Sequence, residues 1–167
     1  IVYKCEKQEN SCVVSDKSES YLLQRQTESI LGADDRSGVF IIVNEWLKGN
    51  KVNFALTSDE EIGAIGASEL EESHIFIEKI AEHKIGSFIE FDRKGYSDII
   101  EYCASDLTTE IQKVLTTYKP VGGVFTDLDK LANVVSGVNL SVGYFNAHSK
   151  SEYQDLGHLE YLCSKIA

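Results

Sequence analysis

The sequence predicts an α/β fold in which helices are layered on a largely parallel β-sheet. Short apolar stretches of strand length alternate along the chain with longer stretches that carry apolar residues at helical spacing. This alternation favours parallel strands, because a parallel connection needs a crossover that is usually a helix. The 167 residues contain no internal repeat and no low-complexity linker, and they suffice to bury one core. We therefore expect a single catalytic domain over residues 1–167.

The first third of the chain is expected to form strands around one helix. Apolar runs bounded by polar turns predict strands over residues 1–7, 11–14, 21–26 and 51–57. Apolar residues at helical spacing predict a helix over residues 37–48, which Gly49 and Asn50 stop. Its inward stripe should consist of Val39, Val43 and Trp46, with Phe40 and Leu47 beside it.

The remainder of the chain alternates more regularly. A helical stretch over residues 64–83 should break near Ser73, and short strands are expected over residues 86–91 and 99–103. Helices over residues 105–117 and 127–135 and a strand over residues 138–143 follow. The last helix is expected to open with Ser149 and Glu152, whose spacing is typical of a capping box.

Composition excludes several classes of partner. Sixteen basic and 27 acidic residues give a net charge of −11, which argues against nucleic acid and anionic membranes. No apolar run approaches the ~20 residues that span a bilayer, and no signal peptide is visible. We therefore predict a cytoplasmic protein, although a chain that begins with Ile1 instead of Met leaves room for an upstream segment.

The four cysteines lack the C-x-x-C spacing of metal sites; they are Cys5, Cys12, Cys103 and Cys163. Free thiols in a reducing cytosol are the first expectation. A disulfide between Cys5 and Cys12 stays open, because these two residues could face each other across a hairpin.

Two adjacent glutamates, Glu60 and Glu61, follow the apolar run at residues 51–57. Neighbouring side chains of a strand point to opposite faces, so both can serve one site only where the strand ends and the chain bends. Gly63 permits such a bend. One carboxylate could then hold a metal while the other takes a proton from water. The alternative is a solvated acidic turn before a helix.

Asp34, Asp92 and His148 share this kind of position, because each follows a strand or lies in a loop that opens a helix. Taken singly, each has an ordinary explanation as a helix cap, an ion-pair partner or a loop histidine. In a parallel sheet, however, such points converge on one edge. Unit charges ~4 Å apart repel by about 4 kcal/mol at an effective dielectric of about 20. A divalent cation would relieve this repulsion, and carboxylate oxygens with an imidazole nitrogen suit zinc, manganese or cobalt.

Four segments give the sequence a resemblance to a known family. They are Gly32-Ala33-Asp34-Asp35-Arg36-Ser37-Gly38, Ser58-Asp59-Glu60-Glu61-Ile62-Gly63, Phe91-Asp92-Arg93-Lys94-Gly95 and Asn146-Ala147-His148-Ser149. In order and spacing they resemble the co-catalytic zinc exopeptidases, the superfamily of bacterial leucyl aminopeptidases, tripeptidase T and glutamate carboxypeptidase. The resemblance extends over residues 31–160.

The resemblance implies a three-layer sandwich with a mostly parallel central sheet and a site for two divalent metals. It implies that Asp34 bridges both metals, that Glu61 and His148 complete one metal site, and that Asp92 belongs to the other. Glu60 would then be the general base. Zinc is the expected metal, with manganese or cobalt as alternatives.

Two departures from the family pattern limit what the resemblance implies. The family carries a further ligand histidine in a His-x-Asp motif upstream of the bridging aspartate, whereas the first histidine here is His74. Either an N-terminal piece with that histidine and further strands is missing, or the protein is degenerate. Only 55 residues separate Asp92 from His148, which leaves no room for a lid domain and resembles short members from bacteria and bacteriophages.

The leading functional expectation is a metal-dependent aminopeptidase acting on a peptide substrate, alone or as a homo-oligomer. Loop residues expected to line the substrate pocket are Thr126, Asp127, Tyr144 and Asn146. For Thr126 or Asp127 the alternative is a helix cap. For the whole chain, the alternatives are a catalytically degenerate member that acts as a structural or binding protein, and a structural domain that holds one cation.

Overall fold

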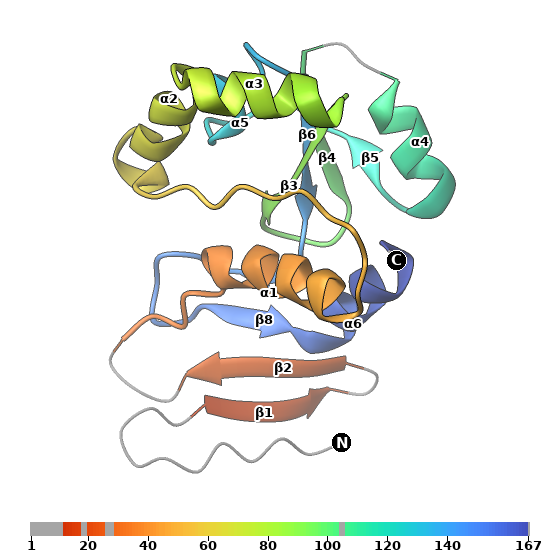
Figure 1. The fold of residues 1–167 in the computed structure, drawn as a ribbon. Coiled ribbons are helices and arrows are strands. Elements are labelled where there is room, and N and C mark those ends of the chain that lie inside the picture. The colour runs from red at the N-terminus through yellow and green to blue at the C-terminus, as the bar shows by residue number, and fades with distance from the viewer. Residues whose placement is uncertain (1–11, 18–19, 26–28, 104–105, 167) are drawn as a thin grey trace. The chain divides into compact units, whose positions relative to one another are not determined.

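The computed structural model describes residues 12–17, 20–25, 29–103 and 106–166. The chain divides into two compact units (Figure 1). The first unit contains Ile1–Val52, Phe91–Tyr96 and Ser141–Ala167, and the second contains Asn53–Glu90 and Ser97–Leu140. The strand expected over residues 1–7 and the pairing of Cys5 with Cys12 fall outside the described residues, whereas Cys103 and Cys163 are free thiols as predicted.

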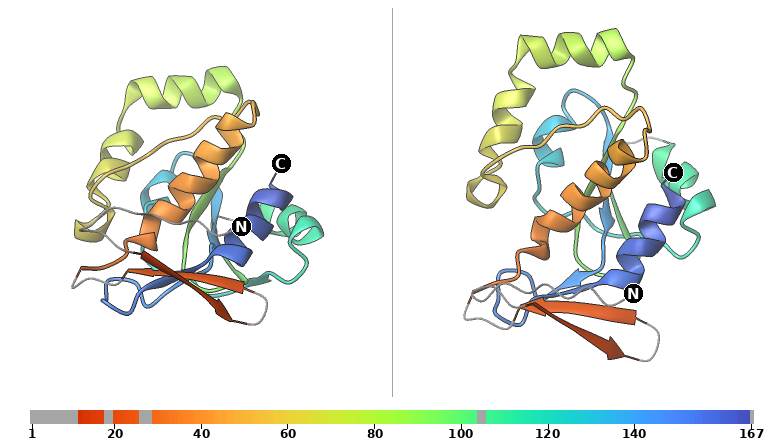
Figure 2. Two further views of the ribbon diagram at one scale, coloured as in Figure 1. Left: turned by 90° about the horizontal axis from the view of Figure 1, so that it is seen from below. Right: turned by 60° about the horizontal axis from the view of Figure 1, so that its bottom comes forward.

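The first unit is built on a four-stranded sheet with the order β1–β2–β8–β7. Its strands are β1 (Cys12–Lys17), β2 (Ser20–Arg25), β7 (Tyr144–Phe145) and β8 (Tyr153–Asp155), and their described pairings are all antiparallel. Helices α1 (Ala33–Leu47) and α6 (Leu156–Lys165) pack together and on this sheet (Figures 1 and 2). Ile41 of α1 and Leu159 and Leu162 of α6 are buried.

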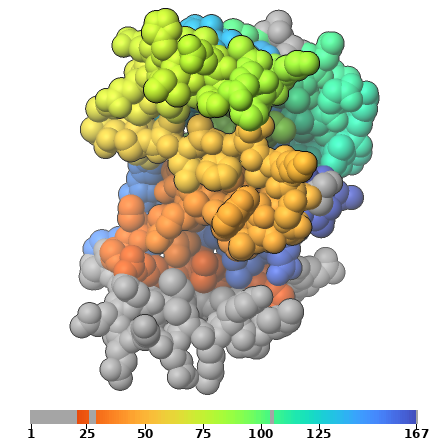
Figure 3. All heavy atoms as spheres, in the orientation of Figure 1, coloured from red at the N-terminus to blue at the C-terminus, as the bar shows by residue number. Residues whose placement is uncertain are grey.

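Helix α1 turns a different face inward from the one predicted. The predicted stripe is exposed instead: the exposed fractions are 37% for Val39, 40% for Val43 and 61% for Trp46, and Phe40 and Leu47 are exposed as well. Atoms of α1 form part of the molecular surface in Figure 3. Its buried residues include Ser37, Gly38, Ile41 and Glu45. Polar residues occupy this face because they find partners there: the Ser37 hydroxyl donates to Gln154 Oε1 at 2.6 Å, and Glu45 accepts from Lys48 at 2.5 Å.

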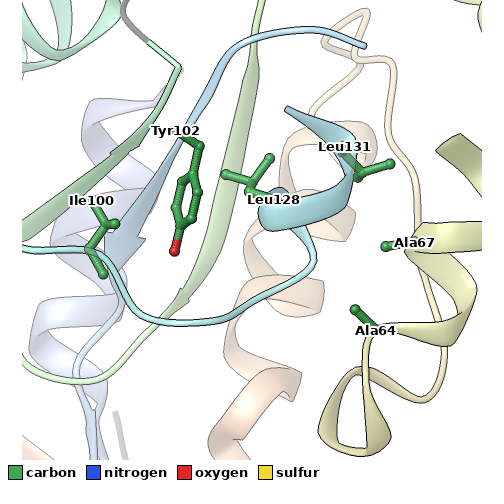
Figure 4. Close-up of a cluster of buried hydrophobic side chains, with 6 residues drawn as sticks. All are labelled: Ala64, Ala67, Ile100, Tyr102, Leu128 and Leu131. Atoms are coloured by element: carbon green, nitrogen blue, oxygen red, sulfur yellow. The ribbon is translucent and has the colours of Figure 1, made fainter. Parts of the chain in front are cut away.

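The second sheet has the order β3–β6–β4–β5. Its strands are β3 (Phe88–Arg93), β4 (Asp98–Tyr102), β5 (Lys119–Pro120) and β6 (Gly137–Ser141), and residues 91–93 and 141 belong to the first unit. The second unit also contains α2 (Ile65–Glu71), α3 (His74–His83), α4 (Leu107–Val114), α5 (Leu128–Leu131) and a 3-10 turn, η1 (Glu60–Ile62). A buried cluster joins α2, α5 and β4 (Figure 4): Ala64, Ala67, Ile100, Tyr102, Leu128 and Leu131.

The prediction of a mixed α/β chain is confirmed, but that of a mostly parallel sheet is not. In the second sheet β4 runs parallel to β5 and antiparallel to β6. The bonds from Phe88 N to Ser136 O and from Val142 N to Arg93 O indicate that β3 and β6 run in the same direction. The described pairings of the first sheet are antiparallel. Between β1 and β2 this is expected, because the two residues that separate them cannot carry a helical crossover. The three-layer arrangement and the single domain stay predictions.

Two further predictions need correction. Residues 51–57 join no strand within the described part of the chain, and their alternate apolar side chains Val52, Phe54 and Leu56 are 39%, 55% and 57% exposed. Strand propensity alone does not build a strand without a neighbour to pair with. The last helix begins at Leu156 instead of at the predicted capping box, because Asp155 caps it by accepting from His158 N at 3.0 Å.

The predicted break near Ser73 is confirmed: α2 ends at Glu71, and the Ser73 hydroxyl caps α3 by accepting from Phe76 N. Among the described residues, no helix combines the length and the hydropathy that crossing a membrane requires.

Candidate metal centre

Asp34 lies where the chain enters α1, and a residue far away in the sequence holds its backbone. Gly32 adopts the left-handed conformation at φ 68°, and Asp34 and Asp35, joined by a cis peptide bond, interrupt the helical geometry. The Glu152 carboxylate accepts from Gly32 N at 2.5 Å and from Asp34 N at 3.1 Å. Glu152 is itself buried. Its two oxygens therefore fix the backbone that carries the Asp34 side chain.

Asp34 and His148, two of the predicted ligands, lie within hydrogen-bond distance of each other. His148 Nε2 lies 2.9 Å from Asp34 Oδ2, with the histidine side chain 57% exposed and the aspartate 13%. Oxygen and nitrogen ligands sit about 2 Å from zinc, so two ligands of one tetrahedral ion lie about 3 Å apart. Asn146, exposed in the same loop, donates from Nδ2 to Ser151 O at 3.2 Å and holds the loop that carries His148.

Asp92 shares a neighbour, Tyr144, with the carboxylates of Asp34 and Asp35. The Tyr144 hydroxyl is buried and donates to Asp92 Oδ1 at 3.1 Å. Burial raises the pKa of Tyr144 far above its usual range, and the negative charges of Asp92, Asp34 and Asp35 raise it further. The contribution of these three aspartates means that negative charge gathers around the phenol. A cation bound among these carboxylates would compensate that charge.

Gly38 allows α1 to approach the chain just before Asp92. A Cβ at this position would collide with the Phe91 carbonyl and would lie 2.6 Å from the Asp35 carboxylate. Asp35 in turn accepts from Gly38 N at 3.0 Å. The absence of a side chain at Gly38 is thus a condition for placing Asp34 and Asp92 in one region of the first unit.

The two glutamates lie in the second unit, on a tight loop. Glu60 and Glu61 open η1, and the loop bends through Asp59 at φ 61°, Gly63 at φ 115° and Ala64 at φ 53°. The predicted bend at Gly63 is therefore confirmed. Glu61 is exposed and Glu60 is half-buried. Since Asp34, Asp92 and His148 belong to the first unit, one ligand set that includes Glu61 stays a prediction.

Thr126 and Asp127, predicted to line the substrate pocket, are only 2% and 7% exposed. The Asp127 carboxylate accepts from the Thr57 hydroxyl. Burial raises the pKa of Asp127, and this hydrogen bond partly offsets the rise. Asp127 precedes α5, but its side chain makes no capping bond there, and Thr126 N instead donates to Asp129 Oδ2 at 3.1 Å. Neither residue therefore caps α5 through its side chain.

Sequence reasoning missed the role of Glu152. Its spacing from Ser149 predicts a carboxylate that caps its own helix, whereas its partners lie 118 and 120 residues away. No local pattern distinguishes these two roles. Tyr144 was predicted as a pocket residue, and its bond to Asp92 adds a contact with a predicted ligand.

The donor set in the first unit fits a transition metal of the zinc type. It combines carboxylate oxygens with one imidazole nitrogen, and a buried partner lies behind Asp34 and Asp92. Lone carboxylates would favour harder cations such as magnesium, and the histidine shifts the preference towards zinc, manganese or cobalt.

No protein-family model and no curated protein matches this chain. Solved structures do match it. The TET1 peptidase of Pyrococcus horikoshii, which can assemble into a tetrahedron or a large octahedral shell, is 21% identical with a TM-score of 0.63, over 95% of this chain and 52% of that chain. The PhTET1-12s dodecamer is 20% identical with a TM-score of 0.60, over 92% of this chain and 52% of its own.

A third match is the aminopeptidase APDkam598 from the archaeon Desulfurococcus kamchatkensis, at 19% identity and a TM-score of 0.55, over 91% of this chain and 50% of that chain. The present chain thus spans about half the length of the solved peptidases that it matches. At 19–21% identity, these matches establish a shared fold. At the level of the fold, the resemblance seen in the sequence is confirmed: the chain shares its fold with part of these archaeal peptidases.

Proposed function

We propose that this chain carries the metal-ligating and proton-accepting residues of a two-metal aminopeptidase. The observation that carries the proposal is the pair of Asp34 and His148, 2.9 Å apart, on a fold shared with archaeal peptidases. Asp92, held by Tyr144, supplies a further carboxylate in the same unit. The substrate would be a peptide with a free N-terminus.

The proposed residue roles follow the resemblance seen in the sequence. Asp34 would bridge two divalent ions, Glu61 and His148 would complete one site, and Asp92 would serve the other. Glu60 takes the proton of the attacking water and delivers it to the leaving amine. When bound, the two ions supply an activated water and polarise the scissile carbonyl. Zinc is the metal that this donor set favours, and manganese or cobalt are the alternatives.

The residues around the ligands position them for this chemistry. The buried Glu152 carboxylate fixes the backbone at Asp34, and the buried Tyr144 hydroxyl orients Asp92. Partners of this kind commonly raise metal affinity, since they remove the freedom of the ligand side chains. Tyr144 and Asn146 remain our proposed pocket residues. The burial of Thr126 and Asp127 favours a role inside the second unit.

A complete second metal site requires a ligand beyond Asp34 and Asp92. The four histidines of the chain are His74, His83, His148 and His158, and none belongs to a His-x-Asp motif upstream of Asp34. We propose that an upstream segment or another subunit of a homo-oligomer supplies this ligand. The archaeal TET1 peptidase, which assembles into large shells, gives a precedent for self-assembly on this fold.

The same gap favours a second candidate function, a catalytically degenerate protein that uses the fold for binding or assembly. One experiment separates the candidates. Zinc content per chain is measured together with hydrolysis of aminoacyl anilides and of their N-acetylated forms. Bound zinc with hydrolysis restricted to free amines supports the aminopeptidase. Bound zinc without hydrolysis in any oligomeric form supports the degenerate protein. A chain that binds no zinc, manganese or cobalt contradicts the assignment of Asp34, Glu61, Asp92 and His148 as metal ligands.

A further inference from the structure

The loop that carries Glu60 and Glu61 must be held against its own strain. Asp59 and Ala64 adopt left-handed backbone conformations, which cost a non-glycine residue roughly 1 kcal/mol each. Inside the loop, Ala64 N donates to Glu60 O at 2.9 Å and Gly66 N donates to Ser58 O at 3.0 Å. These two bonds close the loop on itself. Contacts at its two ends join it to α5 and to the residue that precedes α5.

The end that leads into α2 is attached by apolar packing. Ala64 and Ala67 are fully buried and belong to one cluster with Leu128 and Leu131 of α5, as Figure 4 shows. Gly66 lets this turn lie close to Ser58, since a Cβ there would come within 2.7 Å of Ser58 N. Helix α5 is therefore the support for this end of the loop.

At the other end, a side-chain hydrogen bond joins Thr57 to the residue that directly precedes the same short helix. The Thr57 hydroxyl donates to Asp127 Oδ2, and Asp127 directly precedes Leu128 of the apolar cluster. The preceding residues 52–56 join no strand among the residues that the structure describes, so this end lacks the support of a sheet. Helix α5 thus packs against α2 at one end of the loop, and Asp127, just before α5, is bonded to Thr57 at the other end.

The cost of placing a carboxylate here argues against a purely stabilising role. Asp127 is buried, and its Oδ1 has no hydrogen-bond partner among the described residues. A buried polar atom without a partner costs about 1–3 kcal/mol, which is more than one neutral hydrogen bond usually contributes. The hydrogen bond that Asp127 accepts fixes the position of Thr57, three residues before Glu60.

We infer that Asp127 is a positioning residue for Glu60 and Glu61: its bond to Thr57 fixes the start of their loop on α5. The inference rests on the proposed roles of Glu60 as base and Glu61 as ligand. It assigns Asp127 to holding the two carboxylates in place instead of to contact with substrate. Asp127 and Thr57 belong to the second unit together with both glutamates.

The test is amide hydrogen exchange on the full 167-residue chain, which does not depend on enzymatic activity. Thr57→Val removes the donor at nearly constant volume, and we expect exchange within residues 58–66 to become about five- to tenfold faster. Thr57→Ser, which keeps the hydroxyl, should restore the exchange of the unmodified chain. The matched control is Thr109→Val on α4, an exposed threonine of the same unit.

Substitutions at the acceptor complete the test. Asp127→Asn keeps an acceptor for Thr57 and should protect the loop as the unmodified chain does, whereas Asp127→Leu should match Thr57→Val. The inference is overturned if Thr57→Val leaves residues 58–66 unchanged, or if α4 and β4 lose protection to the same extent. It is equally overturned if Thr57→Ser fails to restore protection, or if Asp127→Asn exchanges as fast as Asp127→Leu.

Kinetics connect the exchange result to the proposed function. With an active preparation, Thr57→Val should lower kcat about tenfold while KM changes less than about twofold, because the base and a ligand move but the pocket does not. A chain that shows the exchange changes but never hydrolyses a peptide would contradict the proposed function and leave the structural role of Asp127 intact. A kcat that is unchanged in a chain with a loosened loop would contradict positioning.

Discussion

The two units hold their candidate functional carboxylates in different ways. In the first unit, buried side chains reach to the ligands: Glu152 accepts from the Asp34 amide and Tyr144 donates to Asp92. In the second unit, the shape of the backbone places Glu60 and Glu61 on one tight loop. A substitution in the first unit should therefore disturb one ligand at a time. A substitution under the loop should displace two carboxylates together.

The largest expected effect comes from the loop itself. Glu60→Gln keeps the size of the side chain but cannot accept a proton, so we expect hydrolysis to fall ~10²-fold or more while zinc binding is retained. Glu69→Gln, at an exposed position of α2, is the matched control and should leave the rate unchanged. The rate is measured under single-turnover conditions with an aminoacyl anilide. A Glu60→Gln chain with half of the original rate would exclude Glu60 as the base.

The next effect separates the two ligands of the first unit. We expect His148→Ala to abolish tight zinc binding, because it removes the nitrogen that lies 2.9 Å from Asp34. Asp92→Ala should scarcely change the tight site, since Asp92 is assigned to the other metal. Competition with a chromophoric chelator measures both affinities, and His83→Ala, exposed on α3, serves as the control. Equal losses for His148→Ala and Asp92→Ala would contradict the assignment to two sites.

A smaller effect is expected from the buried partner behind Asp34. Glu152→Gln replaces one of the two acceptor oxygens with a donor, so either Gly32 N or Asp34 N loses its bond. Substitution of such a partner commonly weakens metal binding about 10- to 100-fold, and we expect the lower end of this range because one acceptor survives. Glu160→Gln, at an exposed position of α6, is the control. Zinc affinity equal to that of the control would show that Glu152 has no influence on the ligand.

The same contrast explains how much of the site was predictable. The bend at Gly63 and the helix that follows Asp34 depend on neighbouring residues, and both are visible in the sequence. The contact of Glu152 with Asp34 joins residues that are far apart in the chain, and local spacing instead predicts a helix cap. Pattern reasoning recovers what neighbours determine and misses what distant partners determine.

The fold shows the same limit. The apolar stripe of α1 predicts the wrong inward face because Ser37 finds a buried partner in Gln154, which no periodicity encodes. Residues 51–57 have the composition of a strand, but a strand also needs a neighbour, and none of the described residues pairs with them. The mixed α/β class was predictable because it depends on the alternation of elements, whereas strand directions depend on pairings between distant segments.

The smallest expected effect tests whether the first unit is the more sensitive one to acid. His158 lies in the first turn of α6, where burial lowers its pKa below the ordinary 6.5 while Asp155 and a backbone bond to Ser141 oppose the shift. The unfolded chain therefore binds a proton at His158 more readily than the folded chain does. The stability that neutral His158 provides is fully present above about pH 6.5 and declines as the pH falls towards the lower folded value.

We expect the free energy of unfolding of the first unit to fall between about pH 7.5 and pH 5 through this group. His158→Gln should remove this part of the pH dependence, whereas His83→Gln on α3 should keep it, because His83 is exposed. Hydrogen exchange of β8 and α6 measures the first unit, and exchange of β4 measures the second. The contrast between the units fails if acid loosens β4 as much as α6, or if His158→Gln retains the full pH dependence.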